Sequence, residues 1–430
     1  MKTLLLLVTI CLAFADDERQ KTCVHDNVSN ALMEFTLRSY KILSSKTASY
    51  KRLSPKTAIQ IPNLFYSPIT VYTTLAELAL GARSLTRTHI LEGMCLDPTL
   101  TDTELHGKYS KLLRSLNREE SDLKIKYVNE LFITNSAKIQ PKYQQNVMDY
   151  YNATIHSIDF NDPKRAEEKI NTYIQKKSKG RIDKLVKDLC NTTVIVPIDY
   201  AMFEARWASP FDPSNTRDGE FKVNKIKTVS VPMMYQRGYF KATSTDNNKN
   251  KIIQVPYSDN MVLLIVVPPL EKLYYLERSL TTSSVRKFLK DSNANALVDF
   301  YLPRFFIHGR IDVNDALLNM DMSSIYSSQN AVFSKITDKP KFKITDVFHQ
   351  ASIKVTEEGT YWIGATPSNG VKLISAVPKF KVDSPFLVIF FDKKTDTIAG
   401  IGRVTDPTSS SFHVEEEEEE EDQCAEVKGK

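Results

Sequence analysis

The chain has 430 residues, of which 42% are hydrophobic, and its net charge is +5. This length suffices for one large core or two domains, and only 13 glycines and 19 prolines argue against long disordered linkers. The charge is uneven, because residues 415–430 carry −7 and residues 1–414 therefore carry +12. We expect a basic body with a disordered acidic tail, residues 411–430, since consecutive carboxylates repel one another.

The N-terminus is typical of a secretory signal, residues 1–15. Lys2 supplies the positive start, residues 4–12 the short apolar run, and Ala13-Phe14-Ala15 the cleavage site. The run is too short to span a membrane, and no later segment approaches 18 apolar residues. These features predict a secreted, extracellular protein without a membrane span.

The cysteines and the glycosylation motifs fit that compartment. Once Cys11 is removed with the signal, the four remaining cysteines can pair in three ways; they are Cys23, Cys95, Cys190 and Cys424. Three Asn-x-Ser/Thr motifs follow the signal, and we expect a glycoprotein; they lie at Asn27, Asn152 and Asn191.

Periodicity predicts a first helix over residues 29–43, a polar loop over 44–62, and further helical patterns to about residue 187. Several short apolar runs predict strands; they cover residues 127–134, 194–196, 261–267, 297–302, 387–391 and 398–404. The last two flank a polar turn and predict a C-terminal hairpin. Together these elements predict one α+β domain, residues 16–410.

Short motifs occur in a fixed order along this domain. They are NLFYSPIT at 63–70, DYAMFEARW at 199–207, VPMM at 231–234, LPRF at 302–305, FHQA at 348–351, EEGT at 357–360, DSPF at 383–386 and GRV at 402–404. In this order and spacing they resemble the serpin family of serine protease inhibitors, and its extracellular antitrypsin-like group.

The resemblance implies an α+β serpin fold with three β-sheets, eight or nine helices and an exposed reactive-centre loop at about residues 357–380. In inhibitory serpins a protease cleaves this loop, the hinge inserts as a new central strand, and the acyl-enzyme is distorted. No cofactor is needed. The sequence also lacks HExxH, GxSxG, phosphate-loop and CxxC patterns. We therefore expect neither an enzyme nor a metal site.

The hinge fits the family only at its start. Glu357, Glu358, Gly359 and Thr360 match, whereas Tyr361-Trp362-Ile363 follow where small residues are usual. In an inserted strand Trp362 would share the inward face with Thr360, and overpacking there costs about 1–3 kcal/mol. Pro367 would also remove a ladder hydrogen bond. These residues predict a non-inhibitory serpin, either a carrier of a small apolar ligand or an extracellular storage protein.

The alternative is a suicide-substrate inhibitor with a serine protease as its partner. Counting from the two ends of the loop places the reactive bond at Leu373–Ile374 or Ile374–Ser375. Either bond suits a chymotrypsin- or elastase-like protease, and Lys372 offers a trypsin-like alternative.

The resemblance also assigns two polar contacts to the sheet that receives the hinge. Ser67, Thr70, Asp199 and His349 match a hydrogen-bonded latch beneath its opening point, and Arg304 and Glu357 match a salt bridge at the hinge base. The family pattern has Asn in place of Asp199. We hypothesise that Asp199 pairs with a protonated His349 and makes the latch sensitive to pH.

A basic segment is a candidate site for a heparin-like polyanion, with a solvated helix face as the alternative. Between residues 164 and 187 nine basic residues stand against three acidic ones; they are Lys164, Arg165, Lys169, Lys176, Lys177, Lys179, Arg181, Lys184 and Lys187. The acidic tail could cover this segment. We expect a monomer that binds no nucleic acid.

Overall fold

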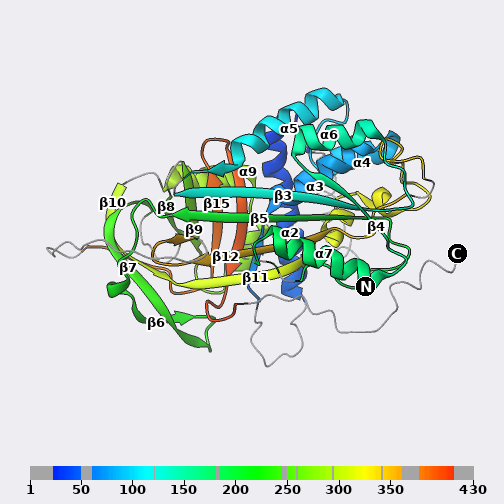
Figure 1. Ribbon diagram of the computed structural model, residues 1–430. Coiled ribbons are helices and arrows are strands. Elements are labelled where there is room, and N and C mark those ends of the chain that lie inside the picture. Colours follow the sequence, from blue (N-terminus) through cyan, green and yellow to red (C-terminus); the bar gives the residue numbers. More distant parts are fainter. Residues whose placement is uncertain are drawn as a thin grey trace, which may run out of the picture.

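The computed structural model describes residues 23–49, 61–120, 122–180, 182, 184–243, 249–257, 260–292, 295–339, 342–360 and 377–410. The predicted signal, the reactive-centre loop from Tyr361 to Ala376 and the acidic tail lie outside these residues. Two β-sheets with helices packed around them make up the described part (Figure 1).

A seven-stranded sheet runs in the order β11-β12-β13-β5-β3-β2, with β4 paired to β3. Strands β3 and β5 form its antiparallel centre, paired over eleven residues from Leu123↔Ala205 to Ile133↔Ile195. The strands are β2 (Arg118–Glu119), β3 (Leu123–Thr134), β4 (Thr154–Ile158), β5 (Ile195–Arg206), β11 (Phe305–Asp312), β12 (Phe348–Val355) and β13 (Gly359–Thr360).

The second sheet has nine strands in two parts, which are joined where β7 pairs with β8 at Lys241↔Gln254 and Ala242↔Ile253. With the seven-stranded sheet, these two parts account for the three sheets that the sequence predicts. The strands are β1 (Leu64–Tyr66), β6 (Arg217–Lys222), β7 (Thr228–Ala242), β8 (Lys251–Pro256), β9 (Met261–Val267), β10 (Asn295–Pro303), β14 (Lys379–Lys381), β15 (Phe386–Asp392) and β16 (Thr397–Val404).

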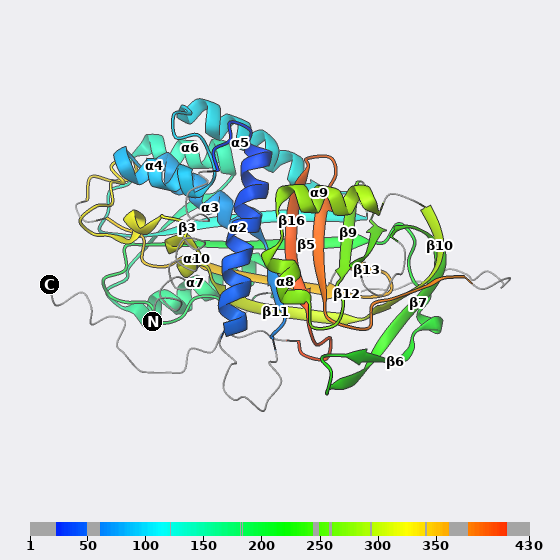
Figure 2. The ribbon, with the colours of Figure 1, turned by 180° about the vertical axis from the view of Figure 1, so that it is seen from behind.

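Nine α-helices occur in the described residues, which agrees with the predicted eight or nine. Helix α3 is buried along its whole length. Helix α2 crosses the face of the molecule that is toward the viewer in Figure 2. The helices are α2 (Val28–Ser49), α3 (Pro68–Gly81), α4 (Ser84–Gly93), α5 (Asp102–Leu116), α6 (Pro141–Tyr151), α7 (Pro163–Lys177), α8 (Leu273–Arg278), α9 (Thr282–Asp291) and α10 (Asn314–Leu318).

Helix α7 covers the outer face of the seven-stranded sheet (Figure 1). Ala166, Ile170 and Ile174 recur at helical spacing and pack in one cluster with Val196 and Ile198 of β5. Helix α3 lies against the opposite face and contacts both β3 and β5. The sheet is therefore enclosed on both sides where α7 covers it, which explains why β3 and β5 are mostly apolar in that half.

The end of the first helix differs from the prediction, and one disulfide settles a question that the sequence left open. The first helix runs to Ser49 instead of ending at residue 43, so residues 44–49 are not part of a loop. A disulfide joins Cys23 to Cys95, which selects one of the three pairings. Of the other two cysteines, Cys190 is buried and Cys424 lies outside the described residues.

Candidate functional site

The seven-stranded sheet is open between β5 and β12. These two strands pair directly only at Phe348↔Ile198, His349↔Asp199 and Gln350↔Tyr200. Beyond that point they separate, and at the far end the two residues of β13 lie between them, with Thr360 opposite both Ala205 and Val355. We call the gap between these two closed ends the slot.

Gly359 allows the hinge to enter the slot. Its φ is +157°, and a Cβ at this position would lie 2.1 Å from the carbonyl oxygen of Ala205. A residue with a side chain could not approach β5 so closely. The sequence motif thus has a direct physical reason at this glycine.

Thr360 is buried and points into the core. Its hydroxyl lies 2.5 Å from the hydroxyl of Tyr257, whose ring stacks on Trp207 with centroids 4.4 Å apart. Because side chains alternate along a strand, a strand continuing from Thr360 would direct residue 362 toward the same interior. Trp362 and Pro367 themselves lie outside the described residues.

The base of the hinge is held by an ion pair. Arg304 donates to the Glu357 carboxylate, and Thr216 Oγ1 donates to the same carboxylate at 2.7 Å. Burial raises the pKa of Glu357, but these hydrogen bonds and the Arg304 charge outweigh it and leave the pKa below its ordinary value. The neighbouring Glu358 accepts a backbone hydrogen bond from Trp207 at 3.0 Å. The hinge is therefore firmly anchored up to the slot.

The four predicted latch residues come together at the end of the slot where β5 and β12 pair directly. They are Ser67, Thr70, Asp199 and His349. His349 Nδ1 lies 2.9 Å from Asp199 Oδ1 and 3.3 Å from Thr70 Oγ1. His349 Nε2 accepts the Ser67 backbone N–H at 3.3 Å. Since Nε2 accepts, Nδ1 carries the ring proton and donates to Asp199. A second ring proton on Nε2 would displace the Ser67 N–H.

Helix α3 adds two residues that the motifs did not indicate. Thr74 donates to Asp199 Oδ2 at 3.2 Å. One turn later both carboxyl oxygens of the fully buried Glu77 lack a hydrogen-bond partner among the described residues. Burial raises the pKa of Glu77 well above 4.5, and the nearby Asp199 and Glu130 raise it further. The signal was present in the sequence, because Thr70, Thr74 and Glu77 recur at helical spacing in an apolar helix.

The Glu77 carboxyl gives a prediction about pH. Because the pKa of Glu77 is higher in the folded state than in the unfolded state, the free energy of unfolding is highest below about pH 4.5, where the carboxyl is neutral in both states. This stability is lost as the pH rises toward the pKa of the folded state. The variant Glu77→Met removes this loss, and we expect it to be more stable than the wild type by about 1–3 kcal/mol at pH 8. Thermal unfolding measured from acidic to alkaline pH checks this. The exposed Glu168→Met is the control, and an equal gain in both variants would contradict the prediction.

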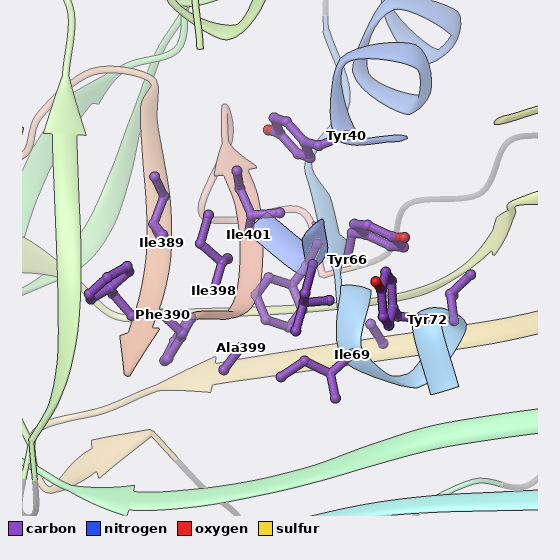
Figure 3. Packing of buried hydrophobic residues seen from close by; sticks show 14 of the residues in the cluster. Tyr40, Tyr66, Ile69, Tyr72, Ile389, Phe390, Ile398, Ala399 and Ile401 are labelled. Carbon is purple, nitrogen blue, oxygen red and sulfur yellow. The ribbon is translucent and has the colours of Figure 1, made fainter. Parts of the chain in front are cut away.

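A cavity of about 480 Å³ occupies the slot and the space beneath it. Its inner part, which we call the chamber, is lined by inward-facing residues of β3, β5 and β12 and closed below by β1, β15 and β16. The chamber residues are Phe65, Ser67, Ile125, Tyr127, Ala201, Phe203, Ala351, Ile353, Thr360, Phe390, Ala399 and Gly400. Figure 3 shows Phe390 and Ala399 on the C-terminal hairpin β15–β16.

The outer part of the cavity, which we call the mouth, lies on the face that carries α7. It is lined by mainly polar residues of β5, β11 and β12, with Phe306 among them, and by the segment after α7. The mouth residues are Ser178, Gly180, Ile182, Lys184, Glu204, Phe306, His308, Gln350, Ser352 and Lys354. The cavity therefore joins a mainly apolar interior to a polar surface.

The basic segment lies on and after α7. Its lysines and Arg165 are exposed in the described residues, whereas Arg181 lies outside them. Lys177 also interacts with the sheet, at 3.4 Å from Glu130 Oε1, while Lys184 lines the mouth. The segment is thus not a uniform charged face, because one lysine is tied to β3 and another borders the cavity.

The three glycosylation motifs are accessible. Asn27, Asn152 and Asn191 are all exposed. Asn27 Oδ1 accepts the backbone N–H groups of Ser29 and Asn30 at 2.9 and 3.1 Å, which caps α2. Asn152 ends α6 in the left-handed conformation. The side-chain nitrogen of Asn27 is not used in that cap, so a sugar there is compatible with it.

An α+β protein with an open central sheet, a hinge strand seated in the opening and a latch beneath it has the architecture that the sequence motifs predict. The family model "Serpin (serine protease inhibitor)" matches residues 42–407. This chain belongs to the serpin family, which comprises inhibitors and carriers and not enzymes.

Individual relatives agree with this assignment. The alpha-1-antitrypsin-like protein GS55-MS of Ictidomys tridecemlineatus is 31% identical over 88% of each chain. Alpha-1-antiproteinase 2 of Equus caballus is 33% identical over 80% of this chain and 82% of its own. Human thyroxine-binding globulin in complex with thyroxine is 28% identical, with a TM-score of 0.79 over 89% of this chain and 99% of its own. Human kallistatin is 26% identical, with a TM-score of 0.79 over 90% and 99%.

Proposed function

We propose that this serpin carries a small apolar ligand in the chamber beneath the slot and does not trap proteases. The observation that carries the proposal is the cavity itself. Its volume of about 480 Å³ falls in the range typical of small-molecule sites, about 300–1,000 Å³. The chamber is walled by Phe203, Ile353 and Phe390, and the polar groups are concentrated at the mouth, as in a site for an apolar molecule.

The relatives support a carrier that is secreted into an extracellular fluid. Thyroxine-binding globulin holds a small molecule and shares this fold. A hibernation-specific plasma protein of Tamias sibiricus is 29% identical over 92% of each chain. The Cys23–Cys95 disulfide also suits an oxidising compartment. In the described residues no helix combines the length and the apolar character that a membrane span needs.

The second candidate function is a suicide-substrate inhibitor, whose loop a chymotrypsin- or elastase-like protease would cleave at Leu373–Ile374 or Ile374–Ser375. Two observations favour it. Relatives of about 30% identity carry the name antiproteinase, and Gly359 and Thr360 already sit in the slot that a longer inserted strand would fill. Carrier and inhibitor therefore differ in what occupies the same space, a ligand or the loop.

One experiment separates the two functions. We expect the neutral apolar dye Nile red to bind the intact protein at a ratio of one to one, and elastase, chymotrypsin and trypsin to cleave the loop without forming an SDS-stable complex. Ala351→Phe fills the chamber and should abolish dye binding. The exposed Ala208→Phe is the matched control and should not. An SDS-stable complex, or unchanged dye binding in Ala351→Phe, would overturn the carrier proposal.

The basic segment stays a proposal for a heparin-like polyanion. Its exposed lysines support it, and the acidic tail supports competition for the same lysines. Elution from a heparin column at a higher salt concentration after removal of residues 411–430 would be the expected result.

A further inference from the structure

The mouth of the cavity carries an excess of positive charge. Lys354 extends from β12, and Lys184 reaches the same opening from the segment after α7. His308 also lines the mouth, and Glu204 of β5 is the carboxylate among the described lining residues. In the register of the slot Glu204 and Lys354 would flank residue 361 on the outer face. Two lysines against one carboxylate give this opening a net positive charge.

The basic segment strengthens that charge. Lys176, Lys177 and Lys179 immediately precede the lining residues Gly180 and Ile182, and all three are exposed. Exposed charges within about 8–10 Å still act at physiological ionic strength. An approaching anion therefore meets a positive potential on the face from which the cavity opens.

The chamber has the opposite character. Apart from Ser67, Tyr127 and Thr360, its lining side chains are apolar. Thr360 is engaged by Tyr257, whereas the buried hydroxyl of Ser67 has no hydrogen-bond partner in the part of the chain that the structure describes. A mainly apolar chamber with a few uncharged hydroxyl groups, and cations at its entrance, match a molecule with an apolar body and one charged end.

We infer that the ligand is an anionic amphiphile, whose apolar body lies in the chamber against Phe203 and Phe390 and whose acid group meets Lys354 and Lys184 at the mouth. This inference rests on the carrier function proposed above. A fatty acid and a sulfated ring system share this chemistry, and the chamber walls accept both. The acid group stays near water, so it avoids the cost of burying a charge.

The test compares an acid with its neutral counterpart. The fluorescent probe 11-(dansylamino)undecanoate should bind the full-length protein at least about tenfold more tightly than its methyl ester, because only the acid forms charge-assisted contacts with the lysines. In the double variant Lys184→Gln/Lys354→Gln the preference should fall to about threefold or less. The double variant Lys176→Gln/Lys179→Gln removes two exposed lysines that do not line the cavity, and it should keep most of the preference. A sulfated steroid that displaces the probe would indicate the ring system, and palmitate the fatty acid.

The outcomes distinguish this inference from the carrier function. Equal binding of acid and ester overturns the inference and leaves the carrier function standing. A preference for the acid that survives in Lys184→Gln/Lys354→Gln, or that is lost equally in the control, also overturns it. If neither probe nor Nile red binds, both proposals fail. Because the four lysine substitutions lie at the surface, unfolding does not confuse the result, and melting curves confirm this.

Discussion

Replacing Glu277 with leucine is expected to lower the free energy of unfolding by about 3–5 kcal/mol, because it leaves Arg403 charged and buried without its partner. Both side chains are essentially inaccessible, with Arg403 at 0% and Glu277 at 1% exposure. Arg403 Nη1 lies 3.0 and 3.2 Å from the two carboxyl oxygens. Tyr40 donates to the same carboxylate at 2.7 Å. Denaturation with urea, followed by fluorescence, measures the loss.

The double variant Arg403→Met/Glu277→Leu is the informative control. A buried ion pair replaced by apolar residues often costs little, so we expect the double variant to recover most of the stability that Glu277→Leu loses. The ion pair between Arg286 and Asp396 is about half exposed, and Arg286→Leu should change the stability by at most about 1 kcal/mol. Equal effects of Glu277→Leu and Arg286→Leu would contradict the prediction.

This ion pair also bears on the proposed carrier function. Tyr40 belongs to α2, Glu277 to α8 and Arg403 to β16, so the cluster fixes two helices to the C-terminal hairpin. The same hairpin lines the chamber with Phe390 of β15 and Ala399 of β16. Loss of the pair should therefore weaken Nile red binding as well as stability.

 

Local patterns predicted the parts of the fold that rest on local chemistry. The run Met261–Val267 is entirely apolar and forms β9 with the expected bounds, because both of its faces are buried. The C-terminal hairpin was also predicted, since a polar turn separates two apolar runs. The first helix was predicted to end too early. Its last turns are stabilised from a distance, where Ser44 accepts a hydrogen bond from Arg403, 359 residues away, and no local pattern contains that contact.

The candidate site also has a part that the sequence motifs indicated and a part that they did not. Motifs located the hinge and the four latch residues, because each of these positions requires a particular residue type, as Gly359 does beside the Ala205 carbonyl. The chamber could not be predicted from the sequence. It depends on where β5 and β12 separate and on Ala399 and Phe390 from the other sheet, which approach it only in the folded chain. A cavity is space that no residue fills, and a one-dimensional pattern does not record it.

The register of the slot also bears on Trp362. In a strand continuing from Thr360, the observed register would place residue 362 between Phe203 and Ile353, facing the chamber. The interior beside this position is not filled, because the chamber leaves open space there. The ring would still have to pass Phe203 and displace any ligand. Under the proposed carrier function, insertion of the loop and occupancy of the chamber would therefore compete.

The substitution Trp362→Ala tests this competition directly. After cleavage of the loop we expect the variant to gain about 1–3 kcal/mol more stability than the cleaved wild type gains, because a small side chain enters the slot without strain. Melting temperatures of intact and cleaved forms measure the gain. Tyr361→Ala is the matched control, since residue 361 would face outward between Glu204 and Lys354. The contrary outcome is that cleavage stabilises Trp362→Ala no more than it stabilises Tyr361→Ala or the wild type. In that case the side chain at 362 does not limit insertion, and the bulky hinge does not exclude protease inhibition.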